Sequence, residues 1–146
     1  GTKGAVVTIR SKALQLSPAI QSSVFVLPLG NDLYTVGSTY NWNDKSNRPT
    51  QEGKEELLTK LRSFVTCDFE VIEHVAGIRP TVKDRRPLVG RHPEYSNLYV
   101  LNGLGTRGVM IAPTIAKELY NHLENDVALR KEINIFLALS LTTKLV

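Results

Sequence analysis

The sequence predicts an α+β fold, in which an antiparallel or mixed sheet packs against helices. Short β-branched and aromatic runs dominate the N-terminal part and return at 70–75 and 98–101, whereas two longer stretches space their apolar residues as amphipathic helices do. The chain has 146 residues, of which 42% are hydrophobic and 22% charged. A chain of this length buries enough apolar surface to form a real core.

Strands are expected first over residues 5–9, 23–27 and 33–36, where β-branched residues predominate. Pro28 should close the second of these strands, because proline cannot donate a ladder hydrogen bond. The last two strands flank Leu29-Gly30-Asn31-Asp32, whose residues tolerate positive φ, so we expect a hairpin. The polar segment Asn41–Pro49 is expected to be a loop.

A helix should follow, with Thr50 as its N-cap. Its apolar stripe consists of Leu57, Leu58, Leu61, Phe64 and Val65. Residues 70–75 alternate as a strand does, which would put Val71, Glu73 and Val75 on one face.

Beyond residue 75 the sequence predicts an irregular segment from Ala76 to Pro93, broken by prolines. Leu98–Leu101 is wholly apolar, as in strands buried on both faces of a parallel sheet. A second helix should run from about Gly108 to Leu123, or begin nearer Met110 so that Pro113 falls in its first turn. A last helix capped by Asp126 would turn Leu129, Ile133 and Leu137 inward.

Several classes of protein are disfavoured by composition. A single cysteine, Cys67, excludes an internal disulfide and a cysteine-rich zinc site, and the histidines lack a partner constellation for a triad or a metal. No apolar run approaches the ~20 residues of a membrane span. The first residues lack the apolar region of a signal peptide, so a cytoplasmic protein is expected. A net charge of +4 without interleaved aromatics makes nucleic acid an unlikely partner.

Basic residues cluster between positions 79 and 91, with Asp84 as the one acid: Arg79, Lys83, Arg85, Arg86 and Arg91. Two interpretations stay open. The cluster is either a solvated loop or an anion-binding surface, and the second would make the chain a non-catalytic anion-binding or interaction module.

Gly103-Leu104-Gly105-Thr106-Arg107-Gly108 spells G-x-G-x-x-G between a predicted strand and a predicted helix. As a dinucleotide fingerprint it lacks the acidic residue that should end a following strand. The dinucleotide interpretation stays open but is disfavoured beside two others, namely a tight turn and an anion site formed by free N–H groups and the helix dipole.

A longer pattern resembles the C-terminal half of FAD-dependent oxidoreductases of the D-amino-acid oxidase and glycine oxidase type. It comprises Lys3-Gly4, Val36-Gly37-Ser38-Thr39, Ala76-Gly77-Ile78-Arg79-Pro80, Pro87-Leu88-Val89-Gly90 and Asn102 to Pro113, in that order. The resemblance covers roughly residues 3–135. It implies FAD as cofactor and oxidation of an amine or amino acid by hydride transfer to flavin.

The resemblance also implies a division of the chain. Residues 1–96 would form the substrate-side antiparallel sheet, and residues 97–146 would supply the last strand and helices of the FAD-binding α/β domain. The Rossmann half that opens such enzymes has no counterpart here, so we expect this fragment alone to be inactive and to hold FAD weakly. Its exposed sheet edge should favour self-association.

Site residues follow from the same resemblance. Arg79 would clamp the carboxylate of a small amine or amino-acid substrate, with Phe25 and Arg107 beside it. The cofactor contacts would come from Gly103, Gly105, Thr106, Arg107, Gly108 and Val109, facing the flavin pyrimidine. No residue is assigned as catalytic. Phe25 and Thr106 depart from the glycine-oxidase pattern, in which tyrosine and arginine are usual, and the loop is similar to that of the oxidoreductase half of the bifunctional tRNA wobble-uridine enzyme.

Overall fold

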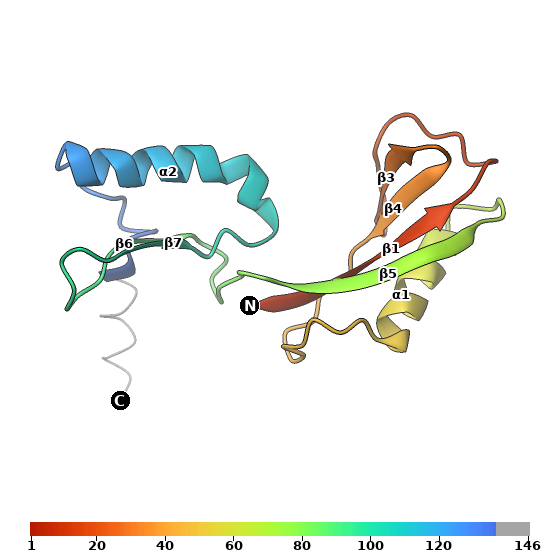
Figure 1. The fold of residues 1–146 in the computed structure, drawn as a ribbon, viewed down its shortest axis with the longest axis horizontal. Coiled ribbons are helices and arrows are strands. Elements are labelled where there is room, and N and C mark those ends of the chain that lie inside the picture. The colour runs from red at the N-terminus through yellow and green to blue at the C-terminus, as the bar shows by residue number, and fades with distance from the viewer. Residues whose placement is uncertain (137–146) are drawn as a thin grey trace. The chain divides into compact units, whose positions relative to one another are not determined.

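The computed structural model describes residues 1–136 and has the expected α+β fold, with an antiparallel sheet and two principal helices (Figure 1). The chain divides into two compact units, one formed by Thr2–Arg79 and the other from Pro80 onward. Each unit is described by itself.

A five-stranded antiparallel sheet forms the first unit, with the strand order β2-β3-β4-β1-β5. Its strands are β1 (Thr2–Arg10), β2 (Ile20–Gln21), β3 (Phe25–Gly30), β4 (Leu33–Gly37) and β5 (Glu70–Arg79). The helix α1 (Gln51–Arg62) lies on one face of this sheet (Figure 1). The face that packs on α1 is called the inner face below, and the opposite one the outer face.

Strict alternation along β1 decides which side chains enter the core. Ala5, Val7 and Ile9 are buried on the inner face, whereas Gly4, Val6 and Thr8 point to the outer face. The two fully buried leucines of α1, Leu57 and Leu61, meet the inner face. The same core contains residues from β3, from β4 and from the segments before β3 and after α1: Val24, Val26, Tyr34, Val36 and Val65.

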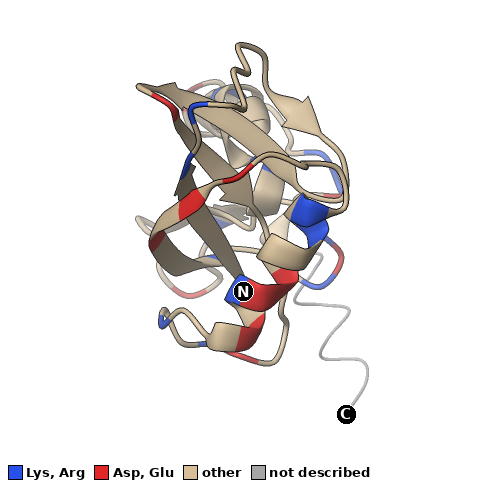
Figure 2. Cartoon of the chain, turned by 90° about the vertical axis from the view of Figure 1, so that its right-hand side faces the viewer, with Lys and Arg blue, Asp and Glu red and all other residues tan. Residues whose placement is uncertain are grey.

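The N-cap prediction for α1 is confirmed, because the Thr50 hydroxyl accepts a hydrogen bond from the Gly53 N–H at 3.2 Å. Acidic Glu52 lies in the first turn and basic Lys60 and Arg62 in the last, which complements the helix dipole. These charged positions are coloured in Figure 2.

The predicted hairpin is present, since β3 and β4 pair in antiparallel register and Gly30, Asn31 and Asp32 have φ of 87°, 52° and 59°. Pro28, however, does not end the strand. It lies inside β3 at an irregular point of the register, where a missing N–H is tolerated.

The expected facing of residues 70–75 is wrong in part. The register between β1 and β5 shifts after Thr8, which pairs with Glu73, so that Ile9 pairs with Val71 and Ile72 is left as a bulge. Val71 therefore faces inward with Ile9, on the face opposite to the one predicted, whereas Glu73 and Val75 share the outer face and His74 faces inward, as expected. The strand also continues to Arg79, four residues past the predicted end.

In the second unit, β6 (Leu88–Arg91) and β7 (Tyr99–Asn102) form an antiparallel pair. The segment 76–93 is therefore less irregular than expected. Tyr99, Val100 and Leu101 of β7 are half-buried, and Leu98 lies outside the strand with 50% of its surface exposed. Within residues 1–136, β7 belongs to no parallel sheet.

A short 3₁₀ turn (Gly105–Arg107) leads into α2 (Gly108–Glu124), so the helix begins at Gly108 and not near Met110. Pro113 lies inside it, and Figure 1 shows that α2 bends near its beginning. Pro113 cannot donate to the carbonyl of Val109, but Val109 is 98% exposed, so water can satisfy that carbonyl.

Ile115 of α2 packs with Val89, Leu129 and Ile133 in a second core. Asp126 does not cap a helix. It has φ 52°, and the chain turns there while the Val127 N–H donates to the Asn121 carbonyl at 3.2 Å. Leu129 and Ile133 are nevertheless buried as expected, and Leu137 lies outside the described residues.

An ion pair between a buried lysine and a partly exposed aspartate fixes the loop that follows β4. The Lys3 side chain is 5% exposed, and its Nζ lies 2.5 Å from Asp44 Oδ2 and 3.2 Å from Ser46 Oγ. Bonds from Lys3, followed by bonds from Ser46, lower the pKa of the Asp44 carboxyl to about 2. Folding therefore favours the ionised carboxylate.

We predict that Asp44→Asn lowers stability at neutral pH and loses its effect in acid. Because the folded pKa is depressed, the contribution of Asp44 is complete above the ordinary carboxyl pKa of ~4 and disappears as the pH falls toward 2. Thermal unfolding of both proteins between pH 7 and 2 tests this. A difference in midpoint that stays constant over that range would contradict it.

Candidate functional site

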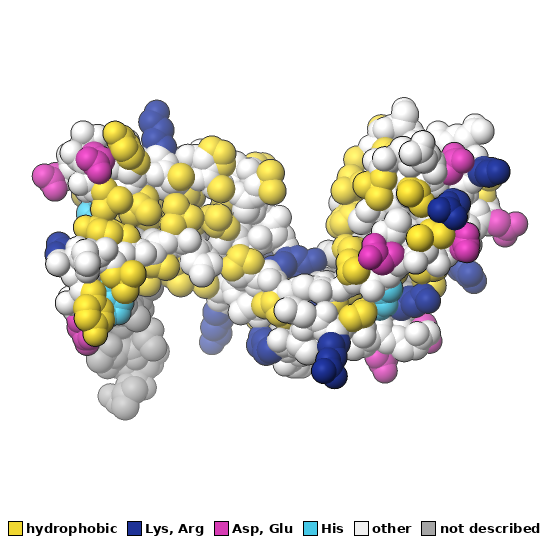
Figure 3. Space-filling model, viewed as in Figure 1, with side chains coloured by type: hydrophobic (Ala, Val, Ile, Leu, Met, Phe, Trp, Pro, Cys, Tyr) yellow, Lys and Arg dark blue, Asp and Glu magenta, His cyan; other side chains and the backbone are white. Residues whose placement is uncertain are grey.

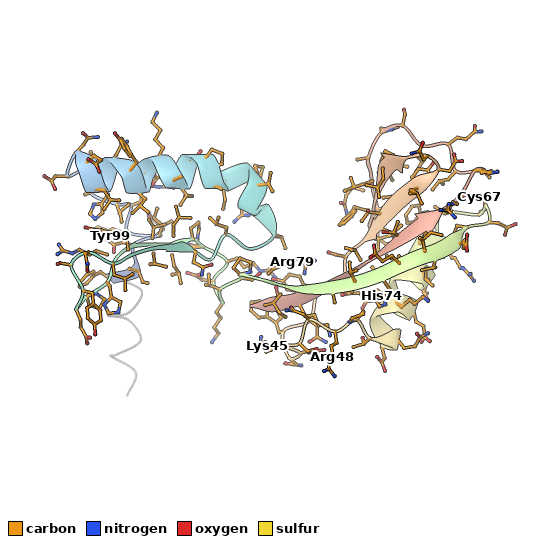
Figure 4. All side chains as sticks on the ribbon, viewed as in Figure 1. Lys45, Arg48, Cys67, His74, Arg79 and Tyr99 are labelled. Carbon is orange, nitrogen blue, oxygen red and sulfur yellow. The ribbon has the colours of Figure 1, made fainter. Side chains whose placement is uncertain are left out.

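Arg79 ends β5 and lies on the outer face of the sheet, opposite α1 (Figure 4). It pairs with Thr2 of β1, and its side chain turns back along β1 to cover Gly4. A Cβ at Gly4 would overlap the guanidinium, with Nη1, Nη2 and Cζ all closer than any real contact allows. The guanidinium thus occupies the space that a side chain at Gly4 would need.

Two further groups hold Arg79. Its Nη1 donates to the Thr39 carbonyl oxygen at 3.3 Å, and its Cζ lies 5.8 Å from the centroid of the Tyr40 ring. Tyr40 in turn meets Trp42 edge-to-face, with ring centroids 5.8 Å apart. Since a guanidinium has five N–H donors, one bond to Thr39 leaves sufficient donors for a bidentate carboxylate.

Phe25 lies on the same outer face, and its ring covers a glycine as the Arg79 guanidinium does. It pairs with Gly37 of β4, and a Cβ at Gly37 would lie 2.6 Å from the Phe25 ring and 2.7 Å from Val6. The ring is therefore laid over β4. By contrast, Gly77 of β5 pairs with Gly4, and a Cβ there would meet nothing within 4 Å.

The structure thus brings Arg79 and Phe25 onto one sheet face, and it adds three residues that sequence reasoning did not assign to a site: Gly4, Thr39 and Tyr40. One signal was available. A glycine inside a strand often marks the close approach of another group, and Gly4 directly precedes the apolar run of residues 5–9.

The loop 103–108 belongs to the other unit. Gly103 and Gly105 have φ of 72° and 58°, so glycine is required at both for conformational reasons. The Gly103 N–H donates to Asn102 Oδ1 at 2.7 Å, and the Gly105 N–H donates to the Pro80 carbonyl at 3.2 Å. Both donors are engaged within the unit.

The start of α2 is different, because no side chain caps either the 3₁₀ turn or α2. Arg107 Nη2 donates to the Arg85 carbonyl at 3.4 Å. Val109 and Met110 are 98% and 71% exposed, and Figure 3 shows hydrophobic side chains exposed over α2. An uncapped helix start beside an exposed apolar surface suits a flat ligand that is partly apolar and carries acceptor atoms.

The basic cluster is divided by the fold. Arg79 is fixed on the sheet, whereas Lys83, Arg85 and Arg86 lie in an exposed segment outside that unit. Asp84 caps the turn there, since its Oδ1 accepts from the Arg86 N–H at 3.1 Å.

His74, which is labelled in Figure 4, lies on the inner face of the sheet near Lys54 and Lys3. Burial, followed by the positive charges of Lys54 and Lys3, lowers the pKa of its imidazole. Within residues 1–136 no group of three or more His, Cys, Asp or Glu side chains is placed to hold a metal ion. No helix in that range is long and apolar enough to cross a membrane.

Residues 2–121 match the family described as DAO, FAD dependent oxidoreductase. The chain therefore belongs to this FAD-dependent family. It is 27% identical over 135 residues to the glycine oxidase of Bacillus subtilis (strain 168), an alignment that covers 90% of this chain and 35% of the relative.

Two other comparisons agree. The tRNA 5-methylaminomethyl-2-thiouridine biosynthesis bifunctional protein MnmC of Shewanella halifaxensis is 28% identical over 156 residues, covering 82% of this chain and 24% of the relative. The crystal structure of iminodiacetate oxidase from Chelativorans sp. BNC1 has the same fold, with a TM-score of 0.76 and 24% identity, over 91% of this chain and 39% of that one. The chain spans about a third of the length of the glycine oxidase that it matches.

We predict that Gly103→Ala destabilises the protein by about 1–3 kcal/mol, because alanine is strained at positive φ and its Cβ would lie 3.0 Å from the Arg86 carbonyl oxygen. Gly108→Ala is the matched control. Gly108 is helical, with φ −51°, and its Cβ would meet Leu104 at an ordinary 3.4 Å. Thermal unfolding should show a lower midpoint for the first variant only. Equal midpoints would contradict the structural role of Gly103.

Proposed function

We propose that this chain supplies the substrate-binding sheet and a flavin-contacting helix start of an FAD-dependent oxidoreductase that oxidises a carboxylate-bearing amine. One observation carries the proposal: the Arg79 guanidinium is held on an open sheet face with donors left for a carboxylate. A bound flavin would supply the acceptor for the hydride that leaves the amine-bearing carbon, and water would hydrolyse the imine that results.

Arg79 would act by orientation. Held by the Thr39 carbonyl and the Tyr40 ring, it meets a carboxylate with little loss of side-chain freedom. A fixed carboxylate fixes the carbon next to it, which is the carbon that loses hydride. Phe25 offers an apolar wall on the same face, and a phenyl ring adds no hydroxyl for the carboxylate. Binding of the substrate carboxylate would therefore depend on Arg79 more strongly than in an enzyme with tyrosine at position 25.

The residues at the start of α2 fit a flavin. We assign the contacts with its pyrimidine edge to Thr106, Arg107, Gly108 and Val109, at a helix start that no side chain caps. Gly103 and Gly105 serve the same site by shaping the turn, since their own N–H groups are engaged. Arg107 would add positive charge near an anionic reduced flavin.

The substrate class we favour runs from glycine to larger N-substituted glycines. Its support is the presence of a glycine oxidase and an iminodiacetate oxidase among the similar proteins, together with the open space above Gly77. We place the substrate side of the enzyme in Thr2–Arg79 and the cofactor side in the unit from Pro80 onward. A fragment of this extent would need the remaining part of such an enzyme to be active.

We predict that Arg79→Ala lowers kcat/KM of the FAD-loaded enzyme by roughly 30- to several-thousand-fold, because a charge-assisted contact to the carboxylate is lost. Arg79→Lys keeps the charge but not the planar fork, so KM should still rise. Steady-state kinetics with glycine and iminodiacetate measure both effects. The flavin absorbance per protein should be unchanged.

Arg86→Ala is the control, because Arg86 is exposed and lies outside the sheet unit. Its kinetics should be near those of the unmodified enzyme. If Arg79→Ala kept normal activity and Arg107→Ala lost it, Arg107 and not Arg79 would be the residue that binds the carboxylate.

A further inference from the structure

We propose that Gly4 is a positioning residue for Arg79: the missing side chain at Gly4 is what allows the guanidinium to lie on β1 and face a substrate. The effect on catalysis that we expect from a side chain at position 4 rests on the function proposed above, whereas the effect on the position of the Arg79 guanidinium does not.

A side chain at position 4 and the Arg79 guanidinium would need the same space. A Cβ at Gly4 would overlap three atoms of the guanidinium at once, namely Nη1, Nη2 and Cζ. The group therefore lies across the Gly4 position rather than touching it with one edge. No larger residue at position 4 is compatible with this placement of Arg79, because atoms cannot share that volume.

If position 4 carried a side chain, the Arg79 guanidinium would move and the β1 backbone would not. β1 is paired on both sides, and around Gly4 the Ala5 N–H donates to Thr39 Oγ1 at 2.8 Å and the Lys3 N–H to the Asn41 carbonyl at 2.8 Å. The backbone at Gly4 is thus tied down, whereas the Arg79 guanidinium is the far end of a flexible side chain. In Gly4→Ala the strand should stay and the guanidinium should leave.

A displaced guanidinium loses its other two restraints, the Thr39 carbonyl and the Tyr40 ring. The charge remains near the sheet, but the fork no longer has a fixed direction. Binding of a carboxylate then costs the ordering of a long side chain, which weakens binding more than it slows the chemical step.

Gly77 provides a matched comparison. It is the cross-strand partner of Gly4 and lies on the same outer face, yet a Cβ at Gly77 would meet nothing within 4 Å. Gly77→Ala therefore measures the general effect of placing alanine in the β1–β5 pair. Any further effect of Gly4→Ala comes from displacing the Arg79 side chain.

The test is a double-mutant cycle in the FAD-loaded enzyme with Gly4→Ala, Arg79→Ala and the double variant. Acetate serves as a competing carboxylate and glycine or iminodiacetate as substrate. We expect Gly4→Ala to raise KM and the acetate inhibition constant about tenfold or more, with a smaller change in kcat. In the Arg79→Ala background the same substitution should change KM by less than about twofold.

A second measurement needs no turnover. With ¹⁵N-labelled arginine, the Nε–Hε signal of Arg79, assigned by its absence from Arg79→Ala, should shift in Gly4→Ala and stay in place in Gly77→Ala. If Arg79→Ala leaves KM unchanged, the proposed function fails, and this signal still decides the role of Gly4. An unmoved signal in Gly4→Ala would overturn the inference. An equal rise in KM in both backgrounds would also overturn it, because Gly4 would then act independently of Arg79.

Discussion

The alternation of β1 is the constraint on which the first unit depends. β1 is paired with β4 on one side and β5 on the other, and it packs on α1 through Ala5 and Val7. A slip of one residue would exchange its faces, burying Gly4 and Val6 and exposing the core residues. The same alternation that forms the core therefore places Gly4 on the outer face, where Arg79 covers it. The register of β1 with β4 and β5 thus determines both the core and the placement of the candidate site.

The lysine before Gly4 extends this link to the loop after β4. Lys3 points to the inner face, and its bonds to Asp44 and Ser46 fix the loop. The backbone of Lys3 is joined to that of Asn41 by two hydrogen bonds. Tyr40, the residue beside Asn41, is the one whose ring meets Arg79. A strand, an ion pair and a loop thus combine to hold one guanidinium.

Local chemistry predicted much of the fold. The Thr50 cap, the hairpin around Asn31 and the apolar stripe from Leu57 to Val65 follow from side-chain hydrogen bonding, tolerance of positive φ and helical spacing, and all three are present. The predicted class, α+β, and the family are confirmed as well.

The errors arose where tertiary contacts override local preference. The bulge at Ile72 reverses the facing that simple alternation gives to the first part of β5. Pro113 is tolerated inside α2 because the carbonyl that it leaves without a helical donor belongs to an exposed residue, Val109. β6 was missed because the prolines that flank it obscure a four-residue strand that only its pairing with β7 defines.

Of the candidate site, the sequence pointed to Arg79, Phe25 and the glycine loop through a resemblance, but not to their surroundings. The covering of Gly4 by Arg79 joins residues from two strands, and no local pattern contains it. The engaged N–H groups of Gly103 and Gly105 likewise depend on partners, Asn102 and Pro80, whose positions follow from the folded turn.

The most direct test of the account is a crystal structure of the FAD-loaded enzyme with acetate bound. The account predicts an acetate carboxylate on the outer face of the sheet, in a bidentate contact with Arg79, while the guanidinium still covers Gly4 and donates to the Thr39 carbonyl. Acetate bound in the enzyme at Arg107 and absent from Arg79, or an Arg79 side chain turned away from Gly4, would contradict it.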